Sequence, residues 1–150
     1  MRLAIERETL QVITDQDGVP TSATWLAEVS LALVLDEHQQ LKPFPSGIYH
    51  AVPLGQTNWY ALACYAVQAA IDAGAVLKLR LESIEAIPAT EYPLPAPRPM
   101  SSRMARGVLE AALTDSLGDS SNMTKSYLLE QSWQSQVVAY VKDLAHRKFI

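Results

Sequence analysis

The sequence predicts a mixed α/β fold for its 150 residues, and two observations indicate it. Short runs rich in Val, Ile and Leu alternate along the chain with longer segments whose apolar residues recur at helical spacing. The hydrophobic fraction of 49% and the charged fraction of 19% are typical of a globular chain with a buried core. We therefore expect residues 1–150 to form one domain, or a portion of a larger one.

The first residues predict a helix end, a strand and a turn, in that order. Residues 2–8 are typical of the last turns of a helix, and no capping residue precedes them. This is a first indication of a truncated N-terminus. Residues 10–14 have the β-branched content and the length of a buried strand. Turn-forming residues fill positions 15–20, where the strand is expected to end.

A second helix is predicted over residues 23–37. Either Thr21 or Ser22 can cap its first turn. The apolar stripe of this helix consists of Leu26, Val29 and Leu33. Residues 47–52 then predict a strand, because apolar side chains on both sides of the alternation suit a strand that is covered on two faces.

A third helix follows, which Thr57 or Asn58 can cap and which is expected to end near Gly74. Its apolar stripe consists of Trp59, Leu62, Ala63, Ala66, Val67 and Ala70. We expect Trp59 to lie in the core. Residues 77–88 predict one or two further strands.

The C-terminal third begins with a proline-rich arm over residues 91–103. A helix is predicted at 101–113, with Ser101 or Ser102 at its start. Residues 114–126 are polar and rich in serine, which favours a flexible connection or a short irregular helix. A last helix is predicted from Trp133 into the basic residues 146–149.

Charge and composition exclude several classes of function. The net charge is -4, from 12 basic and 16 acidic residues spread along the chain, so no face for nucleic acid or for a membrane surface is expected. No apolar stretch is long enough for a transmembrane span, and the N-terminus is too charged for a secretory signal. Cys64 is the only cysteine, which excludes an intramolecular disulfide and fits a reducing cytoplasm.

A search for catalytic motifs finds none. The chain has no glycine triplet for a dinucleotide and no Tyr-x-x-x-Lys pair for proton transfer. His38, His50 and His146 lie far apart and form no metal-ligand pair, so no metal site is predicted. For His50 a packed or edge position competes with a catalytic one, and we favour the former. Cys64 lies among apolar neighbours and is interpreted as a small buried residue.

Three stretches nevertheless form a pattern. The first contains Asp15, Gln16, Gly18, Pro20 and Thr21. The second contains Gly47, Tyr49, His50, Gly55, Thr57 and Trp59. The third contains Tyr92, Pro93, Pro95, Ala96, Arg98, Pro99 and Ser102. In this order and at these spacings they resemble the C-terminal half of the dTDP-4-dehydrorhamnose reductase family, which belongs to the extended short-chain dehydrogenases.

The resemblance implies a fold and a function. The fold is the substrate-binding lobe of a Rossmann-like α/β protein, without the N-terminal half that carries the glycine-rich loop and the catalytic Thr, Tyr and Lys. The family reduces dTDP-4-dehydro-L-rhamnose to dTDP-L-rhamnose with NADPH, or sometimes NADH, which the absent half would bind. This chain would bind the dTDP-sugar and be inactive alone. The alternatives are a non-catalytic binding or regulatory module of the same superfamily and an independent enzyme with an unrecognised site.

The proline-rich arm carries the main candidate for substrate binding, Arg98. Proline fixes φ near about -65° and lacks an N–H group, so an arm with alternate prolines stays extended without joining a sheet. By resemblance, Arg98 would offer its guanidinium to the diphosphate oxygens of the substrate. The competing interpretation is that Arg98 pairs with a surface carboxylate. Many family members have two adjacent arginines here, and since Pro97 replaces the first, a second contact would have to come from Arg103.

Two further substrate contacts are expected from Asp15 and Gln16, which could reach the sugar or the ribose, although shaping the turn is the favoured role. Thr57 is interpreted as a helix cap rather than a ligand contact.

Some relatives hold an interface metal through carboxylates. Asp143 lies near one such position, but Thr24 replaces the acidic residue at another, so no metal is predicted. The stretch between Met104 and Trp133 is longer than is usual in the family, which leaves the substrate class intact.

The resemblance also suggests how the chain behaves by itself. Residues 47–52 abut the cofactor-binding sheet in the family, and an apolar strand without its neighbours promotes association. We therefore expect self-association or a homodimer. The remaining expectations are a dTDP-sugar as ligand, no nucleic-acid or membrane partner, and a cytoplasmic location.

Overall fold

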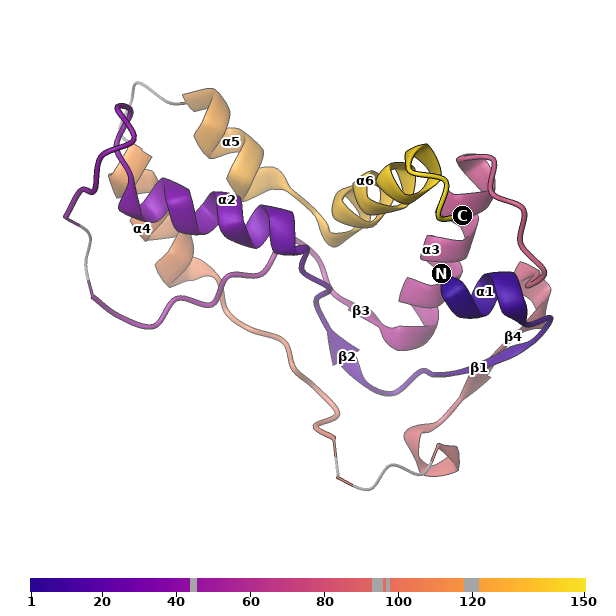
Figure 1. Cartoon of the computed structure of the whole chain (residues 1–150). Coiled ribbons are helices and arrows are strands. Elements are labelled where there is room, and N and C mark those ends of the chain that lie inside the picture. Colours follow the sequence, from indigo (N-terminus) through magenta and orange to yellow (C-terminus); the bar gives the residue numbers. More distant parts are fainter. Residues whose placement is uncertain (44–45, 93–95, 97, 118–121) are drawn as a thin grey trace. The chain divides into compact units, whose positions relative to one another are not determined.

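The computed structural model describes residues 1–43, 46–92, 96, 98–117 and 122–150. Helices and short strands alternate in it, which confirms the mixed α/β class (Figure 1). The chain forms two compact units. The sheet unit comprises Met1–Val19, Gln56–Arg103 and Gln134–Ile150, and the helical unit comprises Pro20–Gly55 and Met104–Trp133.

The sheet unit contains a pair of parallel strands. β1 (Leu10–Ile13) pairs with β4 (Ile84–Ile87) so that Leu10 lies opposite Ile84 and Ile13 opposite Ile87. This confirms the strand predicted at 10–14 and one of the strands predicted within 77–88. Parallel strands need a long connection, and here the chain passes through the helical unit and then α3 before it returns as β4.

Helices cover one face of this pair in the sheet unit. α1 (Arg2–Glu6) has no side-chain cap, as the sequence indicated, and α3 (Trp59–Asp72) packs on β1 and β4 (Figure 1). The N-terminus of α3 is capped by Asn58 rather than Thr57, because the Asn58 Oδ1 accepts a hydrogen bond from the Ala61 N–H at 2.8 Å. The buried core between these elements consists of Ala4, Val67, Leu79 and Ile84.

Two 3-10 turns flank β4, η1 (Leu81–Ser83) and η2 (Ala89–Glu91). The last helix, α6 (Trp133–His146), starts at Trp133 as the sequence predicts. Apart from Trp133 it belongs to the sheet unit. The chain leaves α3 through Gly74, whose φ of 85° lies in the left-handed region that glycine adopts without strain.

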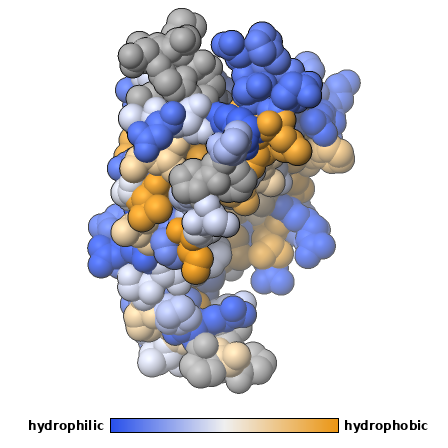
Figure 2. Space-filling model, turned by 90° about the vertical axis from the view of Figure 1, so that its left-hand side faces the viewer, coloured by the Kyte–Doolittle hydropathy of each residue, from blue (hydrophilic) through white to orange (hydrophobic). Residues whose placement is uncertain are grey.

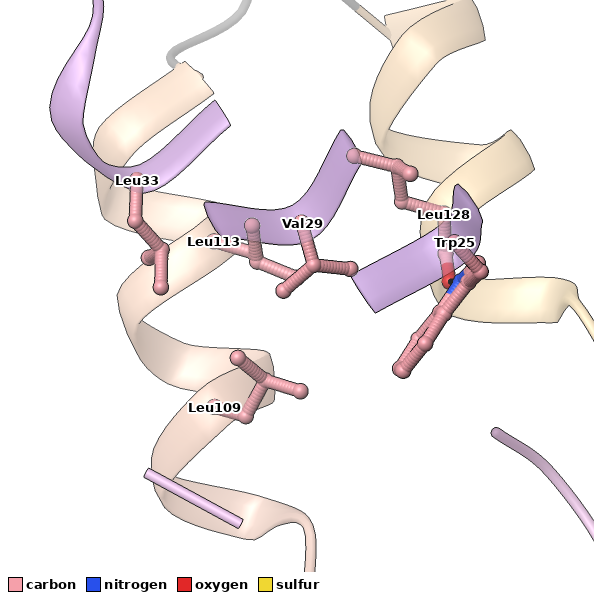
Figure 3. Packing of buried hydrophobic residues seen from close by; sticks show 6 residues of the cluster. All are labelled: Trp25, Val29, Leu33, Leu109, Leu113 and Leu128. Carbon is pink, nitrogen blue, oxygen red and sulfur yellow. Dashed lines mark hydrogen bonds between the residues drawn. The ribbon is translucent and has the colours of Figure 1, made fainter. Parts of the chain in front are cut away.

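In the described part of the helical unit, the helices are α2 (Ala23–Val34), α4 (Gly107–Leu117) and α5 (Asn122–Glu130). The Ser22 Oγ accepts a hydrogen bond from the Trp25 N–H at 3.1 Å, so Ser22 rather than Thr21 is the cap. Figure 3 shows the core, in which side chains of α2 point toward those of α4 and α5. Its buried residues are Trp25, Val29, Leu33, Leu109, Leu113 and Leu128.

Two side chains hold the C-terminal end of α5. The Trp25 Nε1 donates to the Leu128 carbonyl at 3.1 Å, and the Arg106 Nη2 donates to the Leu129 carbonyl at 2.8 Å. Carbonyls in the last turn of a helix have no partner within the helix, and a cation there is favoured by the helix dipole. Arg106 also pairs with Glu110, with 3.0 Å between Nε and Oε1. These contacts fix α5 against α2 and α4.

The expected strand at 47–52 is wrong. These residues form no strand, and Ile48 is 82% exposed, whereas Tyr49 and Ala51 pack against the core of the helical unit. Val52 is buried too, at 8% exposure, so both sides of the alternation are covered in part although no strand forms. Just after this segment, the Leu54 N–H donates to the Gln131 carbonyl at 2.8 Å, whereas Pro53 has no N–H to donate.

Several expectations about helices also need correction. α2 ends at Val34, and Leu26 is 43% exposed because the spacing of Trp25, Val29 and Leu33 defines the buried face. α4 starts at Gly107 rather than near 101, because the backbone of residues 100–102 bonds to Asp17. The connection at 114–126 is mostly helical where it is described, in α4 and α5, and its residues 118–121 lie outside the described part.

The exposed surface is mixed in character. Figure 2 looks onto the side that lies at the left of Figure 1, and there hydrophobic residues form separate patches between hydrophilic ones. Among the exposed apolar residues are Leu31, Leu41, Ile48 and Val108 in the helical unit. In the part of the chain that the structure describes, no helix is both long and apolar enough to cross a membrane.

Candidate functional site

Segments from all three motifs meet in the sheet unit. β2 (Asp17–Gly18), from the first motif, pairs antiparallel with β3 (Thr57–Asn58), from the second. Asp17 also forms a parallel bridge with Ser101 near the end of the proline-rich segment. The Asp17 N–H donates to the Met100 carbonyl at 2.9 Å, and the Ser102 N–H donates to the Asp17 carbonyl at 2.8 Å. Residues far apart in sequence are thereby brought to one place.

The turn after β1 joins this arrangement through Asp15. The Asp15 Oδ1 accepts a hydrogen bond from the Ala89 N–H at 2.9 Å, at the first residue of η2. This contact supports the turn-shaping interpretation for one carboxylate oxygen, since it ties the end of β1 to the end of β4. Gln16 follows in the same turn and is half-buried. No contact with a substrate follows from these positions, so the binding roles of Asp15 and Gln16 stay predictions.

Arg98 is exposed, and among the described residues it has neither a hydrogen bond nor an ion pair. The surface carboxylate of the competing interpretation is thus not found in the described part of the chain. A phosphate-binding arginine needs a guanidinium that its neighbours leave unengaged, and the described residues leave Arg98 in that state. Prolines 93, 95 and 97 lie outside the described residues, so the expected rigid extension of the arm stays a prediction.

Arg103 is exposed too, but its guanidinium is held on two sides. Its Nε donates to the Ser101 Oγ at 3.2 Å, and its Nη1 donates to the Gln56 Oε1 at 2.8 Å. Gln56 is not among the predicted site residues, because it stands at an unspecified position between Gly55 and Thr57 of the second motif. No signal in a single sequence distinguishes such a position, because the contact depends on how distant segments fold together.

Among the described residues, no group of three or more His, Cys, Asp or Glu side chains is placed to hold a metal. Asp143, the possible metal ligand of the sequence analysis, accepts a hydrogen bond from the Arg147 Nε at 2.9 Å. Cys64 lies half-buried in α3 beside Tyr60, and a hydrogen bond between the two raises the pKa of the Tyr60 phenol.

Two side chains of the second motif lie differently from expectation. Trp59 is 56% exposed on α3 and not part of the core, because it occupies the first turn of the helix, beyond the covered residues. His50 is exposed and lies in no strand, so the packed or edge position expected for it is not found, and a catalytic role stays untested.

The fold defines a class, that of Rossmann-like α/β proteins with a substrate-binding domain. The solved dTDP-4-dehydrorhamnose reductase of Bacillus anthracis, in complex with NADP, matches 95% of this chain with a TM-score of 0.68 and 22% identity. The solved reductase of Clostridium acetobutylicum matches with a TM-score of 0.66, also at 22% identity. These likenesses cover 41% of each of those chains and concern the fold alone.

The sequence identifies the family more narrowly. The profile described as RmlD substrate binding domain matches residues 1–144, and the chain belongs to this family. It is similar to dTDP-4-dehydrorhamnose reductase of Escherichia coli K12, with 42% identity over 104 residues, and to that of Burkholderia thailandensis, with 34% identity over 113 residues. The family expected from the three motifs is thereby confirmed.

The relatives are considerably longer than this chain. The E. coli alignment covers 69% of this chain and 33% of that protein, and the B. thailandensis alignment covers 73% and 38%. The chain thus spans about a third of the length of the curated relatives that it matches. The activity of those whole proteins does not transfer to it as a finding.

Proposed function

We propose that this chain is the substrate-binding portion of a dTDP-4-dehydrorhamnose reductase and binds a dTDP-linked deoxy sugar. The observation that carries the proposal is the meeting of the three motif segments at β2, because Arg98 lies two residues before Met100 in one of them and has no bonded partner among the described residues. A diphosphate is the part of such a ligand that an arginine fork recognises best. Family membership supports the substrate class, because relatives of this sequence are named as reductases of dTDP-4-dehydrorhamnose.

The proposed role within the reaction is binding without chemistry. NADPH, or NADH, would be held by a further portion of the enzyme and would supply the hydride to the sugar ketone. The chain itself would bind the diphosphate of the sugar nucleotide through Arg98. Asp15, Gln16 and Arg103 are the further candidates for contact with the substrate. The NADP complex of the B. anthracis reductase supports this cofactor for the longer relatives. A cytoplasmic location is part of the proposal and fits the single cysteine, Cys64.

Replacing Arg98 with alanine is expected to weaken dTDP binding by about tenfold, the cost of one charge-assisted hydrogen bond. Isothermal titration calorimetry of dTDP into the 150-residue chain measures it. Arg80→Ala is the matched control, because Arg80 is an exposed arginine of the same unit beside η1. Equal dTDP affinity in the wild type and Arg98→Ala would remove the phosphate role of Arg98.

The chain alone is expected to leave NADPH unoxidised when the dTDP-linked keto sugar is present. The physical reason is the lack of the glycine-rich loop and of the Tyr-x-x-x-Lys pair in residues 1–150. Absorbance at the nicotinamide band follows the reaction, with a whole reductase as positive control. Turnover by the purified chain would contradict the proposal and favour an independent enzyme. Failure to bind dTDP at all would instead favour a regulatory module.

Self-association stays a prediction, but the reason first given for it does not hold, because residues 47–52 form no two-sided strand. Exposed apolar residues such as Leu41 and Ile48 are a weaker basis for it. Sedimentation velocity of the calorimetry samples decides the point, since a monomer at high micromolar concentration contradicts self-association.

A further inference from the structure

We propose that Gln56 and Arg103 form a clamp that positions Arg98 for the anion. The proposal rests on the proposed function of Arg98 and assigns new roles to two residues next to it. Arg103 would be a positioning residue rather than a second ligand for the diphosphate. Gln56 would be its partner across β2.

The geometry of the clamp follows from the order of three segments. Ser101 lies on one side of β2, and β3 lies on the other. Arg103 continues the first of these segments, and Gln56 directly precedes β3. The hydrogen bond of 2.8 Å from the Arg103 Nη1 to the Gln56 Oε1 therefore joins the two segments that flank β2. The backbone joins β2 to β3 and β2 to Ser101, and this side-chain bond joins the two outer segments directly.

The Arg103 guanidinium is also held by a residue of its own segment, Ser101. The Arg103 Nε donates to the Ser101 Oγ at 3.2 Å, so two of the five N–H groups of the guanidinium are engaged. A planar group with two hydrogen bonds in its plane has little freedom to rotate. A residue engaged in this way is less available to a phosphate than Arg98, which has no such partner among the described residues.

The clamp reaches Arg98 through a short and stiff connection. Only Pro99 separates Arg98 from Met100, whose carbonyl accepts the hydrogen bond from the Asp17 N–H at 2.9 Å. The proline ring fixes φ at Pro99, which removes one of the few rotations between the two residues. The place of Arg98 is therefore set by how firmly residues 100–103 are held. An arginine held in place loses less conformational entropy on binding than a mobile one.

Limited proteolysis tests the clamp without any ligand. Trypsin does not readily cut before proline, so the bond after Arg98 is protected, whereas the bond between Arg103 and Met104 is cleavable. Gln56→Ala is expected to speed cleavage after Arg103 by about threefold, the effect of losing one exposed hydrogen bond. Gln56→Glu, which keeps the acceptor oxygen, should restore the wild-type rate.

A matched control separates the clamp from a general loss of glutamine contacts. Gln68 donates to the Asp72 Oδ1 at 2.7 Å within α3, so this exposed bond joins no two segments that flank β2. Gln68→Ala should therefore leave the cleavage rate after Arg103 unchanged. Equal rates in the wild type and Gln56→Ala would overturn the clamp.

Calorimetry with dTDP then tests whether the clamp acts through Arg98. Gln56→Ala is expected to weaken binding by about threefold when Arg98 is present and to have no effect in the Arg98→Ala background, because coupled residues are not additive. Equal weakening in both backgrounds, or none in the first, would overturn the positioning role. If Arg98→Ala binds dTDP as tightly as the wild type, the proposed function is refuted. The rate of cleavage after Arg103 then still shows whether Gln56 holds Arg103.

Discussion

Replacing Trp25 with alanine is expected to lower the free energy of unfolding of the helical unit by about 3–5 kcal/mol, the usual cost of removing a buried aromatic side chain. Trp25 is 2% exposed and packs in the core that α2, α4 and α5 share. Its indole N–H also holds the Leu128 carbonyl at 3.1 Å. The variant thus loses both apolar contacts and the hydrogen bond at the end of α5.

Urea denaturation followed by circular dichroism at the helical band measures the change for Trp25→Ala. Trp25→Phe separates the two contributions, because it keeps an aromatic ring and loses only the bond to Leu128 and part of the volume. Leu31→Ala is the control on the same helix, since Leu31 is exposed and a surface change there should stay within about 0.5 kcal/mol. A loss of similar size in Leu31→Ala and Trp25→Ala would contradict this account of the core.

The sequence predicted the helices of this chain better than their faces. α2, α3 and α6 begin within a residue of the expected positions because local signals, a capping side chain and an apolar period, define them. Which residues face the core depends on partners elsewhere in the chain. Leu26 and Trp59 both lie on expected stripes and both are exposed. Periodicity identifies an apolar face, but tertiary contacts decide its centre.

The strands show the same limit more strongly. β1 was predicted correctly because its residues carry a local β-branched signal. Residues 47–52 carry a similar signal but have no strand to pair with in this structure, and a strand exists only as one of a pair. Conversely, β2 and β3 have only two residues each and no such signal, and they exist because Asp17 and Gly18 meet Asn58 and Thr57.

Some residues of the candidate site could be predicted from the sequence and others could not. Arg98, Asp15, Gln16 and Arg103 were named from the motifs, which record what a family has in common. Gln56 and the backbone bonds of Asp17 to residues 100–102 were not, because they depend on register between distant segments, and Gln56 and Arg103 lie 47 positions apart in sequence. Composition and periodicity carry no information of this kind.

Replacing Leu79 with alanine is expected to lower the free energy of unfolding of the sheet unit by about 2–5 kcal/mol, the range measured for buried leucines in general. Leu79 is 2% exposed and packs with Ala4, Val67 and Ile84, so its removal leaves a cavity between α1, α3 and β4. Its N–H donates to the Ala4 carbonyl at 3.0 Å, a bond that the variant keeps. The loss is therefore one of packing.

This core supports the candidate site, because β1 leads directly into the turn of Asp15 and into β2. Leu79→Ala should consequently lose dTDP binding at a urea concentration that leaves the wild type folded, and regain it without urea. Val76→Ala is the control from the same loop, since Val76 is 90% exposed and its change should be nearly neutral. Unchanged stability in Leu79→Ala would mean that this cluster does not hold α3 against β4, and the site would need another support.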